Sequence, residues 1–327
     1  MPAVDFSGAH GAVSGPPGSV CGPPSAFDSF VDRGFRMLAA LGVVSILLVI
    51  AALLYEIGGK ALPGMQKYGL EFLSGTVWDV NKHQFGILPA IWGTLYSSLL
   101  ALAIGGFFGV AMAIFLTQDF LPPRLAQVFR TIVELLAAIP SVVYGLWGIY
   151  FVVPAIRPAS DWLHQALGWL PFFGTTLSGP GMAPAAMVLA IMVLPTVAAV
   201  SQDALRAVPM KIKQAAYGMG ATHWEAILKV MVPTAATGIF GALVLGFGRA
   251  LGETMALAML VGNSHQISLS LFAPANTLAA LLALNFPEAG RNEVEVLMYA
   301  ALVLLAITLI VNLLGSAIMT LAQKKVS

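Results

Sequence analysis

The chain has 327 residues, of which 58% are hydrophobic and only 9% are charged. Soluble domains carry about 25% charged residues, so this composition excludes an ordinary soluble protein. A net charge of +1 excludes a strongly basic nucleic-acid surface, and a single cysteine, Cys21, excludes a disulfide framework and a thiolate metal cluster. The apolar runs are continuous rather than alternating, which favours membrane-spanning helices over a barrel.

In chain order, the sequence predicts a tail, a first span and a five-span core. Residues 1–30 are rich in glycine and proline without an apolar period, so we predict a disordered cytoplasmic tail. Residues 31–85 hold the first transmembrane helix, near 37–57, and an outer loop. Within a core at 86–321 the further apolar stretches are 86–116, 131–155, 184–204, 234–262 and 296–321. A cytoplasmic tail at 322–327 follows. The predicted fold class is an all-α integral membrane protein with six transmembrane helices.

The distribution of lysine and arginine predicts the orientation. With the N-terminus inside, ten of these residues fall on cytoplasmic segments and five on outer segments. The positive-inside rule therefore puts both termini in the cytoplasm. The segment 156–182, which contains Trp162 and Trp169, is too apolar for a free loop. We expect it to lie along the outer interface or over the mouth of the bundle.

The third apolar stretch contains two features of interest. Glu134 follows Arg130 by four residues, which predicts an ion pair at the start of the span rather than a gate. Pro140, followed by Ser141, lies inside the stretch and is expected to kink the helix so that a path can open.

The cytoplasmic loop between spans four and five predicts a helix–turn–helix. Gly220 suits a helix C-cap or a sharp turn. Thr222 and Glu225 have the spacing of a capping box that starts a second helix, which returns to the membrane at Pro233. Such a hairpin is either an ordinary capped loop or a shape that docks into a cleft of a partner.

Arg249 and Glu253 are the only charged residues well inside the fifth apolar stretch. At i and i+4 they are expected to share one helix face. A charge in lipid costs at least about 2.5–3.5 kcal/mol, so the pair is expected either to be satisfied within the bundle or to have a function. One interpretation is an ion pair that fixes the helix against its neighbours. The other is that Arg249 offers a planar donor fork to a passing oxyanion, while Glu253 holds it or accepts a proton of phosphate.

The loop at 214–233 resembles the EAA-x3-G-x9-I-x-L-P signature of the permease subunits of binding-protein-dependent ABC importers. The motif positions are occupied by Gln214, Ala215, Ala216, Gly220, Val230, Val232 and Pro233. Gln214 replaces the leading glutamate, and two valines replace isoleucine and leucine. The resemblance implies the type I permease fold, with this segment as the coupling helix that contacts the ATP-binding subunit.

The string at 248–256, GRALGETMA, closely resembles the permeases of phosphate ABC importers, and so do residues 134–145 and the region 189–195. The match is to PstC-like subunits and, with the coupling loop, extends over roughly 86–321. It implies a substrate pathway that includes Arg249, Glu253 and Thr254. It also implies a location in the cell inner membrane. Three kinds of partner are implied: a second permease subunit (PstA-like), an ATP-binding subunit dimer (PstB-like) and an extracytoplasmic phosphate-binding protein (PstS-like).

The sequence has no P-loop, so we expect a transport subunit and no enzyme, with ATP hydrolysed by a partner. The five histidines lack the spacing of metal ligands, so no metal and no cofactor is expected. The main alternative is a permease for another oxyanion, sulfate or molybdate. A non-ABC helical membrane protein is the second, although the spans hold neither clustered catalytic groups nor a repeated filter-like string.

Overall fold

The computed structural model describes residues 26–118 and 120–326. The chain forms two compact units, residues 1–56 and 57–327. The tail predicted for residues 1–30 falls mainly on residues 1–25, which lie outside the described part. The first helix, α1 (Ala26–Tyr68), passes from the first unit into the second.

In the first unit, α1 carries apolar side chains that are exposed along its length. The stretch Asp32–Tyr68 is long and apolar enough to cross a membrane, and it contains the first predicted span. Near its start Arg36 Nη2 lies 2.8 Å from Asp32 Oδ2, an exposed i, i+4 ion pair of the kind that adds little stability.

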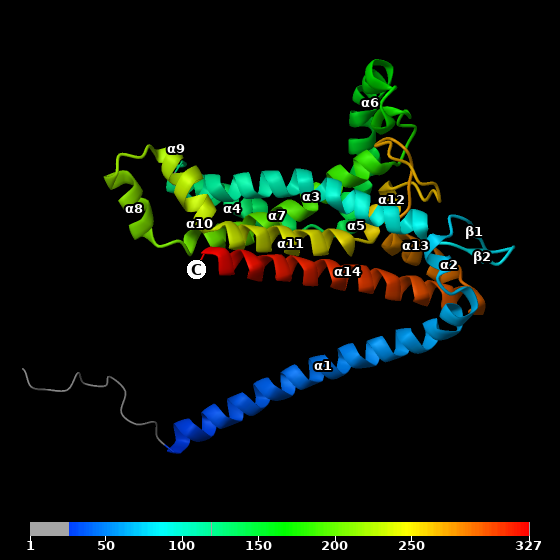
Figure 1. The fold of residues 1–327 in the computed structure, drawn as a ribbon, viewed down its shortest axis with the longest axis horizontal. Helices are drawn as coiled ribbons and strands as arrows, with labels where there is room; N and C mark the ends of the chain where they lie inside the picture. The colour runs from blue at the N-terminus through cyan, green and yellow to red at the C-terminus, as the bar shows by residue number, and fades with distance from the viewer. Residues whose placement is uncertain (1–25, 119, 327) are drawn as a thin grey trace, which may run out of the picture. The chain divides into compact units, whose positions relative to one another are not determined.

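Four long helices form the body of the second unit: α3 (Leu88–Thr117), α7 (Met182–Arg206), α11 (Ala236–Leu251) and α14 (Arg291–Val326). Figure 1 shows them running along the same direction. Helix α3 packs most extensively on α7, and α11 contacts α7, α3 and α14. Glycine allows α3 and α7 to approach closely, because a Cβ on Gly105 would stand 2.5 Å from the Ala190 carbonyl oxygen.

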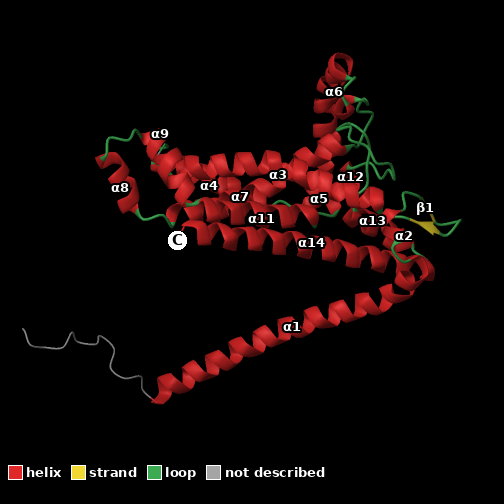
Figure 2. Ribbon diagram, viewed as in Figure 1, coloured by secondary structure: helices red, strands yellow, loops and turns green. Residues whose placement is uncertain are grey.

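Short elements gather at the two ends of this bundle (Figures 1 and 2). One end carries α8 (Met210–Gly218), α9 (His223–Glu225), η3 (Ala226–Met231) and α10 (Val232–Thr234). The opposite end carries α2 (Glu71–Ser74), β1 (Trp78–Asp79), β2 (Gln84–Phe85), η2 (Pro171–Phe173), α13 (Leu278–Asn285) and η4 (Phe286–Glu288). The two strands pair antiparallel, with Trp78 opposite Phe85. The helix α6 (Val153–Leu167) projects from this same end.

Two of the predicted spans are broken rather than continuous. In place of one helix over 131–155, the chain forms α4 (Pro123–Ala138), α5 (Ser141–Trp147) and a π-helical turn, η1 (Gly148–Val152), that leads into α6. In place of one helix over 234–262, it forms α11 and a separate α12 (Met255–Leu260). Mean hydropathy cannot reveal either break, since apolar side chains continue on both sides.

The described residues contain five helices long and apolar enough to cross a membrane. A sixth span results if His223–Thr234 and Ala236–Leu251, which are bent by 67° at their junction, count as one. The predicted class, an all-α membrane protein with six spans, agrees with this count. The third span is shifted, because the qualifying stretch is Ser141–Leu167 and α4 lies outside it. The tail predicted after residue 321 is a helical continuation of α14 to Val326.

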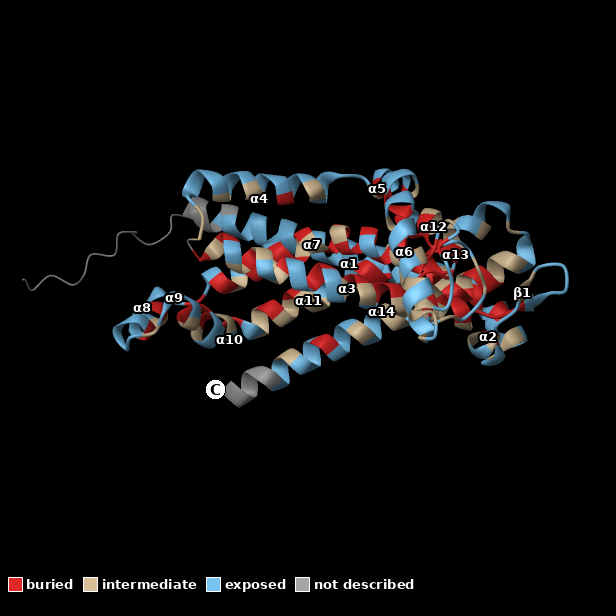
Figure 3. Cartoon of the chain, turned by 90° about the horizontal axis from the view of Figure 1, so that it is seen from above, coloured by how far each residue is buried: buried red, intermediate tan, exposed pale blue. Residues whose placement is uncertain are grey.

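Helix α4 is mostly exposed along its length (Figure 3). Val133 is its only buried residue, and most of its other side chains are exposed. The predicted ion pair between Arg130 and Glu134 is wrong for these described residues. Arg130 instead donates a hydrogen bond from Nη2 to the Leu116 carbonyl oxygen at 3.2 Å, which ties α4 to the end of α3.

At the opposite end of the bundle, the β1–β2 hairpin contacts the segment 261–277. The rings of Trp78 and His265 stack with their centroids 6.1 Å apart. Burial lowers the pKa of the His265 imidazole below its usual range, because a charged ring there would lose hydration. The ring is therefore held neutral against the indole near pH 7.

The close packing of α3 on α7 predicts that Gly105→Ala destabilises the fold. The new methyl group meets a backbone oxygen that cannot move aside alone, and overpacking of this kind costs about 1–3 kcal/mol. We expect a lower thermal unfolding midpoint for the purified protein in detergent. Gly179→Ala is the control, because its methyl group has nothing within 4 Å. Equal midpoints for the two variants would contradict the packing argument.

Candidate functional site

Arg249 lies in the last turn of α11, about 20 Å along the helix from Ala236. A cation at this position interacts favourably with the negative end of the helix dipole. The side chain is exposed in this chain, and Nη1 donates one long hydrogen bond to Thr196 Oγ1 of α7 at 3.5 Å. A guanidinium has five N–H donors, so most of them are available to a further acceptor.

Glu253 and Thr254 occupy the break between α11 and α12. Glu253 is half-buried, and its Oε1 accepts the backbone N–H of Ala256 at 3.3 Å, which caps the first turn of α12. The Thr254 hydroxyl donates to the Gly252 carbonyl oxygen at 3.2 Å. Both side chains thus satisfy backbone groups that the break leaves without helical partners.

The expectation that Arg249 and Glu253 share a face of one helix is wrong. Helix α11 ends at Leu251 and α12 begins at Met255, so Glu253 stands in the connection between them. The structure has no ion pair between these two described residues. Glu253 is engaged with the backbone of α12, and Arg249 is free to face an outside ligand.

Pro140 and Ser141 mark the second break. Helix α4 ends at Ala138, and Ile139 is extended, with φ −69° and ψ 128°, as steric contact with a following proline favours. Ser141 is the first residue of α5. The kink predicted inside a single span is therefore a complete interruption between two helices.

The hairpin formed by α8, α9, η3 and α10, residues 210–234, confirms the predicted helix–turn–helix. Gly220 has φ +86°, a left-handed conformation that L side chains rarely adopt. Around it the N–H of Ala221 donates to the Ala216 carbonyl oxygen at 3.1 Å, and the N–H of Gly220 donates to the Tyr217 carbonyl oxygen at 2.9 Å. These two bonds form a Schellman motif, which closes the end of α8.

The second arm of the 210–234 hairpin starts with the predicted capping box. The Thr222 hydroxyl accepts the Glu225 N–H, and Glu225 Oε2 accepts the Thr222 N–H at 3.1 Å. Lys229 Nζ lies 2.9 Å from Glu225 Oε1 and adds an exposed ion pair. The arm bends sharply after Pro233 to continue as α11.

The motif residues of the hairpin divide into two groups by exposure. Gln214, Ala215 and Gly220 are exposed, whereas Ala216 is buried. Val230 and Val232 are half-buried, and Pro233 is exposed. The hairpin therefore presents Gln214 and Ala215 outward and uses Ala216 for its own packing.

An aromatic cluster joins the hairpin to the end of α3. His223 Nε2 lies 3.2 Å from the Gln118 carbonyl oxygen, and its Nδ1 lies 2.8 Å from the Tyr217 hydroxyl. The Phe120 ring contacts His223 edge to face, at 5.0 Å between centroids, and contacts Trp224 at 4.9 Å. The hairpin is thus in direct contact with the α3–α4 connection.

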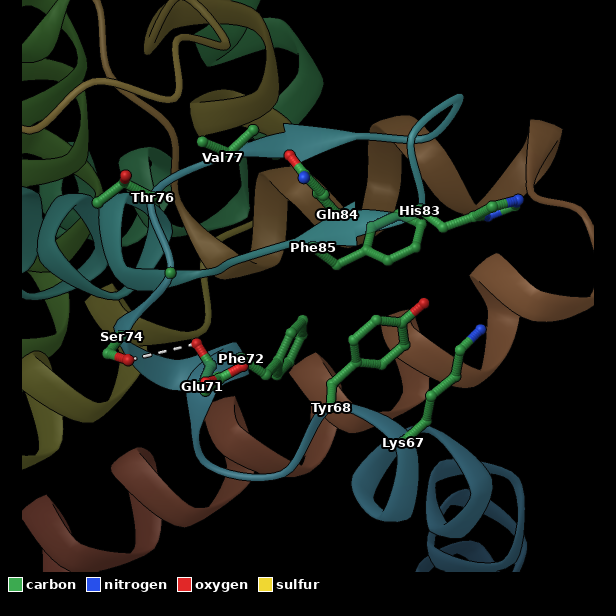
Figure 4. A pocket seen from close by; sticks show the side chains of 11 residues that line it. Lys67, Tyr68, Glu71, Phe72, Ser74, Thr76, Val77, His83, Gln84 and Phe85 are labelled. Carbon is green, nitrogen blue, oxygen red and sulfur yellow. Dashed lines mark hydrogen bonds between the residues drawn. The ribbon is translucent and has the colours of Figure 1, made fainter.

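At the opposite end, a cavity of about 490 Å³ lies between the C-terminal end of α1, α2 and the β1–β2 hairpin. Figure 4 shows the side chains that line it. The Tyr68 and Phe85 rings meet edge to face, with 5.6 Å between centroids. Lys67 Nζ lies 5.1 Å from the centroid of Tyr68. The Ser74 hydroxyl donates to the Glu71 carbonyl oxygen at 3.3 Å. The lining of the cavity combines the aromatic residues Tyr68, Phe72 and Phe85 with polar residues such as Gln84.

Comparison with known proteins connects this geometry to a family. Residues 105–327 match the family described as binding-protein-dependent transport system inner membrane component. This chain belongs to that family. It is therefore a multi-pass inner-membrane component of a transport system rather than an enzyme, as predicted.

Relatives with high coverage share one description. The chain is 37% identical to the phosphate transport system permease protein PstC of Haemophilus influenzae, over 90% of this chain and 95% of that protein. It is 36% identical to the protein of the same name from Xylella fastidiosa, over 91% and 93%. It is 35% identical to the probable phosphate transport system permease protein PstC of Methanocaldococcus jannaschii, over 85% and 90%.

Solved structures confirm the predicted permease fold. A chain of the inward-facing MetNI methionine ABC transporter matches with a TM-score of 0.54 at 19% identity, over 72% of this chain and 95% of that chain. A chain of a bacterial ABC transporter involved in the import of the acidic polysaccharide alginate matches with a TM-score of 0.59 at 16% identity, over 89% and 97%.

Sequence reasoning missed Thr196, which accepts the hydrogen bond of Arg249, and Tyr144, whose hydroxyl donates to the Leu136 carbonyl oxygen at the Pro140 break. Thr196 directly follows Pro195 inside α7, and Tyr144 lies four residues after Pro140. A hydroxyl close to a proline in an apolar span was the available signal, because the proline leaves backbone acceptors that such a group can satisfy.

The left-handed turn of the hairpin predicts opposite effects for two neighbouring glycines. Gly220→Ala forces an L side chain into φ +86° at a cost of about 1–2 kcal/mol, although nothing lies within 4 Å. Gly218→Ala, also in open space but helical, should be neutral or stabilising by about 0.5–1 kcal/mol. We expect faster amide hydrogen exchange in residues 215–222 of Gly220→Ala only. Equal exchange in both variants would contradict the turn assignment.

Proposed function

We propose that this chain is the permease subunit of an ATP-driven importer of inorganic phosphate and forms half of its translocation pathway. The names of the relatives, which cover nearly the whole chain, support phosphate as the substrate. The second permease subunit (PstA-like) supplies the other half. An ATP-binding subunit dimer (PstB-like) supplies the energy, and an extracytoplasmic phosphate-binding protein (PstS-like) delivers the anion.

The observation that carries the proposal is the exposed guanidinium of Arg249. A charged side chain left in lipid costs at least about 2.5–3.5 kcal/mol, so this face of α11 is expected to be covered by the partner permease rather than by acyl chains. Its single long bond to Thr196 leaves donors for a ligand. A planar fork of N–H groups matches the geometry of phosphate oxygens. We place the pathway at the interface that Arg249 faces.

Glu253 and Thr254 lie next to Arg249 along the chain, and we assign both to the pathway. Because Glu253 forms no ion pair with Arg249, its role is not to hold the guanidinium in place. Its negative charge lowers the local positive field, which favours release of the anion. A carboxylate oxygen also accepts a hydrogen bond from a protonated phosphate oxygen, which fully ionised sulfate does not offer.

The 210–234 hairpin is proposed to couple ATP hydrolysis to transport. Its outward residues, Gln214 and Ala215, contact the ATP-binding subunit, and Gly220 sets the turn that presents them. Ala216, Val230, Val232 and Pro233 maintain the shape of the hairpin and its junction with α11. The aromatic contact of His223 with Phe120 supports transmission of the movement to α3.

The remaining assignments complete an alternating-access cycle. Both termini and the 210–234 hairpin are cytoplasmic, as the lysine and arginine distribution favours. The binding protein docks on the outer segments 56–85, 156–182 and 263–295, the first of which includes the cavity of Figure 4. Pro140 and Ser141 form a gating joint in the third span. ATP-driven closure moves the hairpin, and phosphate passes Arg249 into the cytoplasm.

Uptake of labelled phosphate by proteoliposomes that contain all four kinds of subunit tests this function. We expect Arg249→Gln to lower uptake about tenfold or more, because charge-assisted hydrogen bonds contribute about 1.5–3 kcal/mol. Arg249→Lys keeps the charge but loses the fork, so it should retain only part of the activity. Arg124→Gln, exposed on α4, is the control.

Sulfate and molybdate serve as competitors in the same assay. If sulfate or molybdate inhibited uptake and unlabelled phosphate did not, the substrate would be that other oxyanion and not phosphate. Normal uptake by Arg249→Gln would remove Arg249 from the pathway.

Glu253→Gln separates charge from capping at the helix break. The amide oxygen of glutamine still accepts the Ala256 N–H, so the thermal unfolding midpoint should stay unchanged. The negative charge is lost, and we expect a lower maximal rate of phosphate uptake together with weaker discrimination against sulfate. Uptake and selectivity equal to those of the unmodified complex would discard both proposed roles of Glu253.

A further inference from the structure

The break between α4 and α5 leaves one backbone acceptor without its helical donor. In a continuous helix the Leu136 carbonyl oxygen would accept the N–H of the residue four positions later. That residue is Pro140, which has no N–H. An unpaired carbonyl is unfavourable in the interior of a membrane protein, where water does not replace the missing donor.

The Tyr144 side chain supplies the missing donor. Its hydroxyl donates to the Leu136 carbonyl oxygen at 2.8 Å, a distance typical of a good O–H···O bond. Tyr144 belongs to α5 and is 6% exposed, so the bond is shielded from competing water. A single side-chain hydrogen bond thereby bridges the two helices across the break.

Tyr144 lies where the two helix breaks of the chain meet. Gly145 of α5 and Gly148 of η1 allow a close approach to α12, because a Cβ on them would stand 2.7 Å from Met259 Sδ and 2.5 Å from Leu260 Cδ1, respectively. Helix α12 is the segment that Glu253 caps. Tyr144 belongs to the same buried apolar cluster as Ala250, the residue that follows Arg249. The bridge therefore stands beside the proposed anion pathway.

The two sides of the bridge differ in how firmly they are held. Helices α5 and α12 pack together through their glycine contacts. Helix α4 has one buried residue, Val133, and is otherwise held by contacts with α7 and by the bond of Arg130, in its middle, to Leu116. Reorientation of α4 against α5 therefore gives up little buried side-chain packing besides the Tyr144 bond.

We propose that Tyr144 is a positioning residue whose hydroxyl latches α4 to α5 across the Pro140 break, and that this latch sets the angle of α4 while phosphate passes Arg249. The inference rests on the proposed transport function. It adds a named contact to the gating joint and explains why a tyrosine follows the proline by four residues. The Tyr144 side chain does not bind the anion in this proposal.

Tyr144→Phe tests the latch in the assembled complex. We expect maximal phosphate uptake to fall about fivefold, the ratio that corresponds to one net hydrogen bond. The phosphate concentration for half-maximal uptake should not change, because the hydroxyl positions α4 and does not contact the ligand. Tyr96→Phe is the matched control, since it removes a Tyr hydroxyl bond of the same 2.8 Å length, to Leu269, outside the joint.

A distance measurement reports the joint independently of transport. Spin labels at Val128 of α4 and Tyr150 of η1, both exposed, are introduced after replacement of Cys21 by serine. Tyr144→Phe should broaden the distance distribution, and Tyr96→Phe should not. In Pro140→Ala the restored N–H satisfies Leu136, so adding Tyr144→Phe should cause no further broadening.

The outcomes separate this inference from the function on which it rests. If the unmodified complex does not import phosphate, the proposed function fails. If it does import phosphate and Tyr144→Phe matches it in both uptake and distance distribution, the latch is refuted. The latch is also refuted if Tyr144→Phe broadens the distribution as much in the Pro140→Ala background as alone.

Discussion

A helix that is interrupted inside a membrane must find new partners for the backbone groups that the interruption releases. This chain meets that requirement twice with side chains from its own break regions. The Tyr144 hydroxyl donates to the Leu136 carbonyl oxygen, which Pro140 leaves without a helical donor. The Glu253 carboxylate accepts an N–H at the start of α12. Both solutions are local, so each break is specified in the sequence by a residue within four positions of it.

The two breaks meet because small residues allow α5 to lie directly on α12. Arg249 lies in the last turn of α11 before one break, and Tyr144 at the other break belongs to the same buried cluster as Ala250, the residue after Arg249. Polar groups that would be unfavourable individually in an apolar bundle are thus concentrated at one place. A permease needs such a place, since an anion must be stabilised inside the membrane while the helices around it change their angles.

The shape of the hairpin at 210–234 is determined by hydrogen bonds within the hairpin itself. Its turn is closed by the two bonds around Gly220, and its second arm is fixed by the capping box of Thr222 and Glu225. These local hydrogen bonds hold the two arms in one shape, as the proposed coupling role requires. The ring contacts of Phe120 with His223 and Trp224 connect the hairpin to the α3–α4 connection.

Much of the fold followed from the sequence. Apolar runs gave the helical membrane class and most of the spans, because hydrocarbon requires long, continuous apolar helices. The hairpin was predicted correctly down to Gly220 and the capping box, since turns and caps depend on a few adjacent residues. The spans at 131–155 and 234–262 were wrong as continuous helices, because an interruption leaves hydropathy unchanged.

The amino-acid sequence by itself determined that Arg249 lies in an apolar segment and that the 210–234 segment is a capped hairpin. The tertiary structure decided that Arg249 and Glu253 do not pair, and that Tyr144 spans the Pro140 break. The reason is physical: helix spacing fixes neighbours only while the helix continues. Once it ends, the packing of α5 on α12 and of α11 on α7 determines which side chains meet.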